Sequence, residues 1–542
     1  MKNPNASFAR VFACRSILLA VVVLSGLGCA ADPGMIPIKV PPPPLLTVQP
    51  PVKNPQPRIL YVDQTLSTSP CPGYSARDRL CSGGASMAFK SIGEAGLAAM
   101  AGDAIEIRAG SYHEQISPAR SGVEGAEITY RNFNGEAVTI SQVDHPAIFL
   151  QNKSHIVIQG ISVNDALGWG RLENAHNNTI TSNRFRNALA RGTTGGLKLV
   201  RSHYNRIMGN SFDAGNDSVV IQESDHNLIA DNKFRFARHS LLSVRCGNFN
   251  VIRGNEFHNE RQKAMEIYDC EGVSDAPFKL DATKRNVIED NRFIFTRGPS
   301  RPHKYNAIQF SGQYGIVRRN IFQDNQGGGL HFQIYKNEAL YSYGNRAYQN
   351  TFYKNRCYAL AGSQQWGEVF GDNLVVNNLF FRNEDCTGRP EQIAVANPSA
   401  VILRENAILK PKDDFPFASE SDGDLRLKPN SPLIDAGAFL TRTVGAGSGT
   451  AVPVADVRFF SDGFGIRGMR GDLIQLEGGR ERARVERIDY GRGMLLLDTD
   501  LNWKDGQGVA LSFEGKAPDM GAVESGSRFE GKGSRWEVQG AR

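Results

Sequence analysis

The sequence predicts an all-β protein in which short parallel strands wind into a solenoid. A motif, Asn-x-(Ile/Val/Ala)-x-x-Asn-x-Phe, returns seven times between Asn178 and Phe380. The copies, with a degenerate one at Gly315, begin 22 to 36 residues apart, which is solenoid spacing with loops of variable length. None of these segments has the apolar i, i+3, i+4, i+7 spacing of a helix. The 56 Gly and 26 Pro among 542 residues also suit a turn-rich β protein.

Each motif is expected to supply the turns and the core of one coil. Its Asn residues suit turns because Asn tolerates left-handed backbone angles and its amide can bond the equivalent group of the next coil. Its Ile and Phe residues are expected to stack in the core. Together these features predict a right-handed parallel β-helix. The copies are Asn178–Phe185, Asn205–Phe212, Asn227–Phe234, Asn250–Phe257, Asn286–Phe293, Asn345–Phe352 and Asn373–Phe380.

The first 57 residues are interpreted as a signal peptide, residues 1–30, and a proline-rich linker, residues 31–57. Basic residues precede an apolar run at 16–27 that is too short for a membrane span. Cleavage after Ala30 is one alternative. The other is a bacterial lipoprotein with its lipid on Cys29, although Gly26 stands where such a signal has Leu. We therefore expect a secreted, periplasmic or outer-membrane-attached protein of a bacterial envelope, with a lipid anchor in the second case.

The rest of the chain divides into four predicted parts. Residues 58–137 form an N-terminal cap with a short helix and the first coils, and residues 138–440 form the parallel β-helix. A helix over the open end would protect an edge that could otherwise recruit another chain. Residues 441–516 form a small inserted β module, and residues 517–542 form a closing motif and tail. Long excursions at 271–285 and 297–305 mark a binding face.

Cysteine positions fit an oxidising compartment. Cys71 and Cys81 share one loop, and Cys357 and Cys386 take nearly equivalent places on neighbouring coils, so both pairs are predicted disulfides. Cys246 and Cys270 also lie on neighbouring coils and are either paired or simply buried. The formal net charge of +6 is small for this length, which argues against a nucleic-acid partner.

The register of the repeats predicts two columns of outward side chains on one sheet. Ser243, Glu266, Gln309 and His331 form one column, and Gln222, Arg245, Tyr268, Ser311 and Gln333 form the other. Strands about 4.8 Å apart match roughly one sugar unit, which favours a polysaccharide groove. The excursion at 297–305 adds the basic residues Arg297, Arg301, His303 and Lys304, which favour an acidic polymer.

These residue types suit chemistry on a uronate. Removal of its C5 proton needs a group that neutralises the carboxylate and groups that exchange protons. Arg245 could bind the carboxylate, Tyr268 or His331 could exchange protons, and Glu266 could bind a metal or a hydroxyl. Lyase and epimerase reactions share this first step. The predicted substrate-binding residues are Gln222, Gln309, Arg297, Arg301 and Lys304.

One coil carries a family resemblance. The segment SLLSVRCGNFNVIRGNEF, residues 240–257, resembles the arginine-bearing coil of the alginate lyase and chondroitinase B family. The resemblance implies a catalytic role for Arg245 and makes calcium a candidate cofactor. Glu223 stands where that family has a catalytic lysine, and its calcium-binding glutamates fall near Asn216 and Ser218.

Two other readings stay open. A non-catalytic glycan-binding or structural surface protein could use the same groove. Glycoside hydrolysis needs two carboxylates about 5 to 10 Å apart, for which Glu266 and Asp269 are the evident pair.

Overall fold

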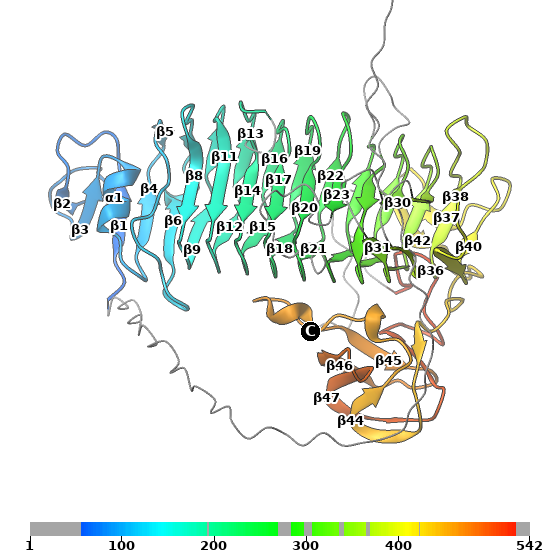
Figure 1. Cartoon of the computed structure of the whole chain (residues 1–542). Coiled ribbons are helices and arrows are strands. Elements are labelled where there is room, and N and C mark those ends of the chain that lie inside the picture. The colour runs from blue at the N-terminus through cyan, green and yellow to red at the C-terminus, as the bar shows by residue number, and fades with distance from the viewer. Residues whose placement is uncertain are drawn as a thin grey trace, which may run out of the picture. The chain divides into compact units, whose positions relative to one another are not determined.

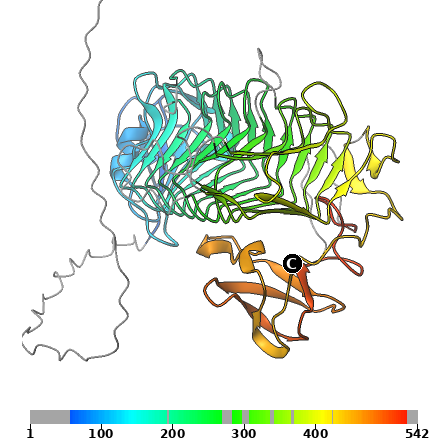
Figure 2. The ribbon, with the colours of Figure 1, turned by 45° about the vertical axis from the view of Figure 1, so that its right-hand side comes forward.

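The computed structural model describes residues 56–191, 195–268, 283–296, 306–334, 341–364, 369–421 and 423–526, all within one compact unit. These residues form the predicted right-handed parallel β-helix, whose coils stack one behind another (Figures 1 and 2). The signal peptide, Cys29 and almost all of the predicted linker lie outside the described residues.

Each full coil contributes one strand to each of three long sheets of 10, 15 and 12 strands. The ten-stranded sheet carries the two predicted columns and is called the site sheet. Its strands, in spatial order, are β8 (Pro146–Gln151), β11 (Gly168–Glu173), β14 (Leu197–Val200), β17 (Val219–Gln222), β20 (Leu242–Arg245), β23 (Met265–Tyr268), β26 (Ile308–Phe310), β30 (Leu330–Ile334), β34 (Leu360–Gln364) and β38 (Ile393–Val395).

The other two long sheets complete the coils. The 15-stranded sheet contains β2 (Cys71–Tyr74), β3 (Ser86–Phe89), β1 (Ile59–Val62), β4 (Ala104–Ile107), β6 (Ile128–Asn132), β9 (Ile156–Gln159), β12 (Thr179–Thr181), β15 (Arg206–Met208), β18 (Leu228–Ala230), β21 (Val251–Arg253), β24 (Val287–Glu289), β28 (Ile316–Arg318), β32 (Arg346–Tyr348), β36 (Asn373–Val376) and β39 (Val401–Arg404). The 12-stranded sheet contains β5 (Gly110–Tyr112), β7 (Val138–Ile140), β10 (Ser162–Asn164), β13 (Arg184–Arg186), β16 (Ser211–Asp213), β19 (Lys233–Arg235), β22 (Glu256–His258), β25 (Arg292–Ile294), β29 (Ile321–Gln323), β33 (Thr351–Tyr353), β37 (Leu379–Phe381) and β40 (Ala407–Ile408).

The repeated Asn residues form the expected ladders. The Asn178 amide donates to Asn205 Oδ1 over 3.0 Å, and Asn183 does the same to Asn210 over 3.1 Å. All four side chains are buried. The prediction that these Asn residues take left-handed backbone angles is wrong, however. The left-handed residue is the one before each ladder Asn, for example Asn177 with φ 56°. The ladder Asn is selected for its buried amide.

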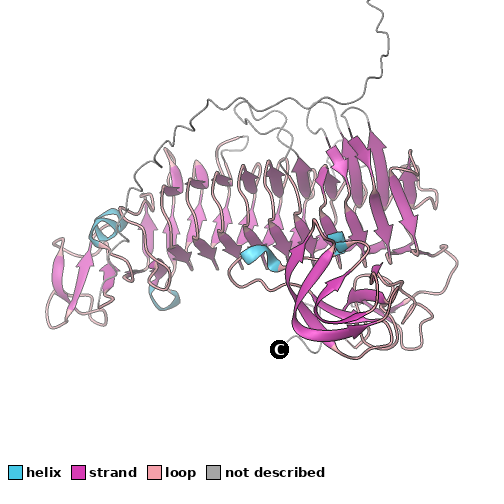
Figure 3. Cartoon of the chain, turned by 60° about the horizontal axis from the view of Figure 1, so that its bottom comes forward, coloured by secondary structure: helices cyan, strands magenta, loops and turns pink. Residues whose placement is uncertain are grey.

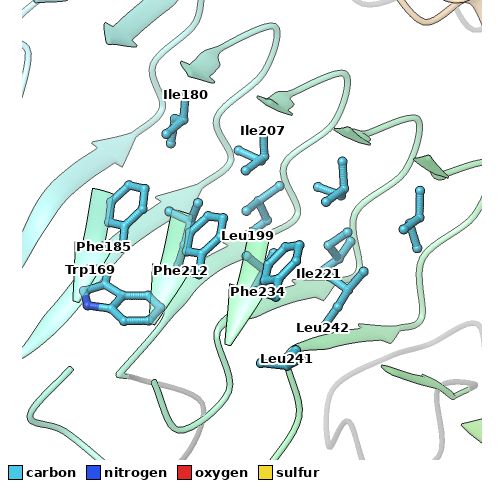
Figure 4. Packing of buried hydrophobic residues seen from close by; sticks show 14 of the residues in the cluster. Trp169, Ile180, Phe185, Leu199, Ile207, Phe212, Ile221, Phe234, Leu241 and Leu242 are labelled. Carbon is cyan, nitrogen blue, oxygen red and sulfur yellow. The ribbon is translucent and has the colours of Figure 1, made fainter. Parts of the chain in front are cut away.

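The motif's apolar residues stack in the core as expected. Phe185, Phe212 and Phe234 lie parallel with ring centroids 4.9 Å apart, and Ile180 and Ile207 form a second row (Figure 4). These stacks bury every Phe of the motif. The solenoid is therefore rigid around its axis, and its outward side chains have fixed places.

The N-terminal cap contains the one α-helix of the described residues, α1 (Ile92–Ala98), shown in cyan with the short 3-10 turns in Figure 3. Ser91 caps it, and Glu94 bonds back to the Ser91 backbone to complete a capping box. Ile92 and Ala95 pack into the solenoid core. The predicted helical cap is confirmed.

The C-terminal module is a six-stranded sheet of β43 (Thr441–Arg442), β44 (Gly447–Pro453), β45 (Leu473–Leu476), β46 (Arg482–Asp489), β47 (Met494–Trp503) and β48 (Gly508–Leu511), with antiparallel pairing. Residues 424–437, which form the first half of the closing motif, meet its second half at 517–524 where Gly437 donates its backbone N–H to the Pro518 carbonyl over 2.7 Å. The module is thus inserted between them, as the sequence predicts.

Candidate functional site

The two columns have the register that the sequence predicts. Strand pairing places Ser243, Glu266, Gln309 and His331 in one line across β20, β23, β26 and β30. It places Gln222, Arg245 and Tyr268 in the second line. Arg245, Glu266 and Tyr268 lie on adjacent strands. His331 lies two strands beyond Glu266 and belongs to a separate pocket.

Glu266 is covered rather than exposed. Its outward register predicts an open carboxylate, but its side chain is 0% exposed because Lys263 and His239 lie over it. Lys263 Nζ donates to Glu266 Oε1, His239 Nε2 lies 3.7 Å from the same oxygen, and the Ser243 hydroxyl lies 3.5 Å from Oε2. Burial alone would raise the pKa of Glu266, but the charges of Lys263 and His239 hold it at about 2. Glu266 is therefore an anionic anchor that does not reach the groove surface.

A buried aspartate extends this network. His239 Nδ1 donates to Asp217 Oδ1 over 2.7 Å, and the Asp217 side chain is only 3% exposed. Burial opposes the charged imidazole, but the hydrogen bond to Asp217 and the nearby Glu266 raise the pKa of His239 above its ordinary value. Lys263, His239 and Asp217 each stand two or three residues before a strand of the site sheet. Charges therefore alternate along Asp217, His239, Glu266 and Lys263.

Arg245 and Tyr268 are paired across β20 and β23, next to Glu266. The Arg245 guanidinium carbon lies 5.5 Å from the centre of the Tyr268 ring. Arg245 Nε is buried and has no hydrogen-bond partner among the described residues, which leaves a donor without its acceptor. Lys263 Nζ lies 3.4 Å from the Tyr268 hydroxyl oxygen. Arg245 as a whole is partly exposed, so a carboxylate bound by its outer guanidinium nitrogens would lie beside the Tyr268 side chain.

Lys198 adds a further cation that sequence reasoning missed. It lies in the column of Ser243, separated from it by Val220 on β17. Burial, and then the charges of Arg171 and Arg245, lower the pKa of Lys198. Arg171 precedes Lys198 in the same column. Arg171 lies 3.2 Å from Glu173 and Arg201 lies 3.7 Å from Glu223, so the site sheet carries both cations and anions on the N-terminal side of Glu266.

Of the other predicted substrate-binding residues, two lie on the site sheet and three lie outside the described residues. Gln222 lies on the groove and donates to Glu223 Oε1 over 3.1 Å. Gln309 has the predicted place but is only 6% exposed. Arg297, Arg301 and Lys304, with the neighbouring His303, lie outside the described residues. Asp269, proposed as the partner of Glu266 in hydrolysis, lies outside them as well.

His331 lines a pocket with a volume of about 520 Å³ between β30, β34 and β38. Its Nδ1 lies 3.0 Å from the Asn306 amide nitrogen, and its Nε2 lies 2.8 Å from the Ser363 hydroxyl oxygen. Burial lowers the pKa of His331 to about 4. The imidazole is therefore neutral at pH 7 and is separated from Arg245, so these two residues do not form one catalytic group.

Both predicted disulfides, Cys71–Cys81 and Cys357–Cys386, are present. Cys246 is disulfide-bonded too, which supports the paired alternative, while Cys270 lies outside the described residues. No helix in the part of the chain that the structure describes is long and apolar enough to cross a membrane.

The donors near the site do not suit calcium. Asn216 and Ser218, at the positions where the resembling family carries glutamates, supply no carboxylate. The Glu266 carboxylate already has Lys263 and His239 as its counter-charges. Within the described ranges, no group of three or more His, Cys, Asp or Glu side chains could hold a metal ion. Calcium dependence therefore stays a prediction that these residues do not favour.

Comparison with known proteins gives partial matches. Residues 130–294 match a family described as periplasmic copper-binding protein (NosD), although the described residues hold no ligand cluster for such a metal. An uncharacterized protein, YwoF of Bacillus subtilis (strain 168), is 34% identical over 84 residues, which cover 14% of this chain and 18% of that relative. The match thus spans less than a fifth of the relative's length.

Solved structures with similar arrangements are named as enzymes that act on polysaccharides. Pectate lyase Pel9A is 14% identical with a TM-score of 0.44, covering 86% of this chain and 96% of that one. A PL6 family polysaccharide lyase from Pseudopedobacter saltans is 16% identical with a TM-score of 0.42, covering 62% and 95%. An alginate lyase from Paenibacillus sp. is 14% identical with a TM-score of 0.36, covering 57% and 93%. The chain is similar to these β-helix proteins in its general architecture.

Proposed function

We propose that this protein binds an acidic, uronate-containing polysaccharide along the site sheet and removes the C5 proton of a uronate, as a lyase or a C5 epimerase. The arrangement of Arg245 beside Tyr268 carries the proposal. Arg245 is partly exposed with its guanidinium carbon 5.5 Å from the centre of the Tyr268 ring, and Lys263 lies 3.4 Å from the Tyr268 hydroxyl. The site therefore combines a carboxylate-binding donor with a proton-exchanging group.

The proposed reaction uses these groups as follows. Arg245 binds the uronate carboxylate and stabilises the negative charge that spreads onto it when the C5 proton leaves. Tyr268 exchanges the proton, because Lys263 lies 3.4 Å from its hydroxyl oxygen and favours negative charge there. Glu266 holds Lys263 in place without touching the substrate. Elimination then breaks the bond between C4 and its oxygen, and the proton that Tyr268 took from C5 passes to the leaving oxygen. In epimerisation a water molecule instead gives a proton to the opposite face of C5, and the hydroxide that remains takes the proton from Tyr268.

The cations of the site sheet support an anionic polymer. Lys198 lies in one column, Arg245 lies in the other, and Lys263 lies over Glu266. Arg171 already has a carboxylate partner in Glu173. A polymer that carries carboxylates matches the remaining cations better than a neutral one.

An extracytoplasmic location fits both the disulfides and the family match. Cys71–Cys81 and Cys357–Cys386 would be reduced in a typical cytosol. The matching family is described as periplasmic. We propose the bacterial envelope as the location, with lipidation of Cys29 as the means of outer-membrane attachment.

The test is incubation with a panel of uronate polymers, such as alginate, polygalacturonate and unsulfated chondroitin. A lyase yields unsaturated products that absorb in the ultraviolet, and an epimerase changes the C5 configuration seen by NMR. Arg245→Ala should abolish either activity, and Arg245→Lys should restore little because Lys cannot bind a carboxylate bidentately. The proposal fails if no polymer is changed, or if Arg245→Ala retains full activity.

A non-catalytic glycan-binding protein is the second candidate. The observation that favours it is the burial of the column residues, since Glu266, Gln309 and Tyr268 are 0%, 6% and 7% exposed. Few groups would then reach a substrate. Binding of a polymer without chemical change, lost in Arg245→Ala, would establish this candidate and reject catalysis.

A further inference from the structure

The pocket beside His331 is distinct from the Arg245 site in its chemistry. Its walls are small and mostly apolar, and its polar groups gather at one end. The lining residues are Asn306, Gly327, His331, Cys357, Tyr358, Ala361, Gly362, Ser363, Cys386, Ala394, Val395 and Ala396. None of them carries a formal charge at pH 7, because His331 is kept neutral by its burial. The pocket therefore offers nothing that would neutralise a carboxylate.

Hydrogen-bond directions at the polar end can be assigned from the Asn306 amide. Its nitrogen is only a donor, so His331 Nδ1, 3.0 Å away, is the acceptor. The proton of the neutral imidazole then lies on Nε2, which donates to the Ser363 hydroxyl oxygen over 2.8 Å. That hydroxyl can turn its own hydrogen toward a ligand. The series of hydrogen bonds thus ends at the Ser363 hydroxyl, which can donate to an acceptor on a ligand.

A donor beside small apolar walls matches one common sugar substituent. An acetyl group has a carbonyl oxygen that accepts a hydrogen bond and a methyl group that packs against Ala361 and Ala394. These two alanines are paired across β34 and β38 in the same column as His331. We propose that this pocket, called the acetyl pocket, binds the acetyl group of an N-acetylated or O-acetylated sugar. The Ser363 hydroxyl donates to its carbonyl.

The acetyl pocket also defines a spacing on the polymer, and this part of the inference rests on the proposed function. Three strands, β23, β26 and β30, separate β20 with Arg245 from β34 with Ser363. Four strand spacings are about 19 Å, which corresponds to about four sugar residues of an extended chain. The preferred substrate therefore carries its acetyl group about four sugars from the uronate that Arg245 binds.

The pocket is tested without a polymer by saturation-transfer NMR on the full chain with N-acetylglucosamine, O-acetylated glucose and unmodified glucose. We expect saturation of the acetyl methyl protons, and little transfer to glucose. Ala361→Leu fills the pocket from its outward face and should abolish the methyl signal. Ser363→Ala removes one hydrogen bond and should weaken binding about fivefold. Ala418→Leu, the same exchange at an exposed position on β41 (Phe417–Ser419), is the control and should change nothing.

Equal saturation of glucose, or a methyl signal that survives Ala361→Leu in a folded protein, overturns the acetyl pocket. Comparison of the two acetylated sugars shows which linkage it accepts. The polymer arm compares an O-acetylated uronate polymer with the same polymer after mild alkaline deacetylation. Arg245-dependent binding that ignores acetylation rejects the acetyl pocket and leaves the proposed function standing. Acetyl-dependent binding that survives Arg245→Ala rejects the proposed function and leaves the acetyl pocket standing.

Discussion

At the residue scale, the site combines side chains inside strands, whose direction follows from the two-residue period of a strand, with side chains in turns, whose direction does not. Arg245, Glu266 and Tyr268 lie inside strands, where the alternation of side chains fixes their direction. Asp217, His239 and Lys263 lie in the turns before those strands, where no period operates. The available signal was a charged or titratable residue two or three positions before the start of each of these strands. It becomes visible only once the turns are known to fold over the sheet.

Lys263 is predicted to stabilise the fold through Glu266. Lys263→Met leaves a buried carboxylate with only the partly exposed His239 as counter-charge, and removal of one partner of a buried pair costs about 3 to 5 kcal/mol. Urea unfolding should show this loss. The double variant Lys263→Met, Glu266→Gln removes the orphaned charge and should recover most of it. Equal losses in the single and double variants would show that the contact, and not the charge, was stabilising.

His239 is predicted to make stability pH-dependent. Its pKa is raised in the folded protein, so its contribution is fully present below the unfolded value of about 6.5 and is lost as pH rises through the folded pKa. The carboxylates Asp217 and Glu266 face it, and Lys263 opposes it. Unfolding free energies of the wild type should fall more steeply than those of His239→Gln as pH rises above about 6.5. His258→Gln, on the 12-stranded sheet, serves as the control and should follow the wild type.

At the element scale, the Asn ladders were predictable because each repeated Asn bonds the equivalent Asn of the next repeat. The repeat did not reveal which residue takes the left-handed conformation. The positions before the ladder Asn hold residues as different as Ser182, Tyr204 and His226, all with positive φ. A conformation imposed by stacking rather than by residue preference leaves no compositional signal. The Cys357–Cys386 disulfide was predictable for the same reason as the ladders, since equivalent positions on adjacent coils lie close together.

Removal of one ladder amide should destabilise a whole region. Asn232 donates to Asn255 Oδ1 and to the Ile207 carbonyl, and its oxygen accepts from the Asn210 amide and backbone. Asn232→Ala leaves several buried polar groups without partners, at about 1 to 3 kcal/mol each. Hydrogen exchange should rise in the flanking coils first, because each coil contacts only its neighbours. Asn502→Ala, at an exposed position on β47, should have little effect; similar exchange in both variants would contradict a structural ladder.

At the scale of the whole molecule, the inserted module is docked on the 15-stranded sheet. Apolar side chains of that sheet and of the module share one buried cluster, which includes Leu228, Val287, Val452 and Ile474. Arg318 joins the two parts and is 2% exposed. The sequence predicted the module but not this contact. Arg318 and its partner in the module, Asp472, stand 154 residues apart in the sequence, and no repeat relates these two positions.

Arg318 should therefore decide whether the module stays docked. Its guanidinium donates to Glu289 and to both oxygens of Asp472 over 2.6 to 2.8 Å, and a buried carboxylate that loses its partner destabilises the contact. Arg318→Met leaves Asp472 facing Glu289, which should weaken docking by about 3 to 5 kcal/mol.

Limited proteolysis should then cut near residues 441 and 516, and exchange should rise in β18, β21 and β24 while the Asn ladders stay protected. The exposed Arg492→Met is the matched control. Unchanged cleavage in Arg318→Met would show that the apolar cluster and the other polar contacts, such as Arg346 with Asp456, hold the module without Arg318. Simultaneous opening of the ladders would show that the module and the solenoid unfold as one cooperative unit, because a docked but separable module can expose only the sheet that it covers.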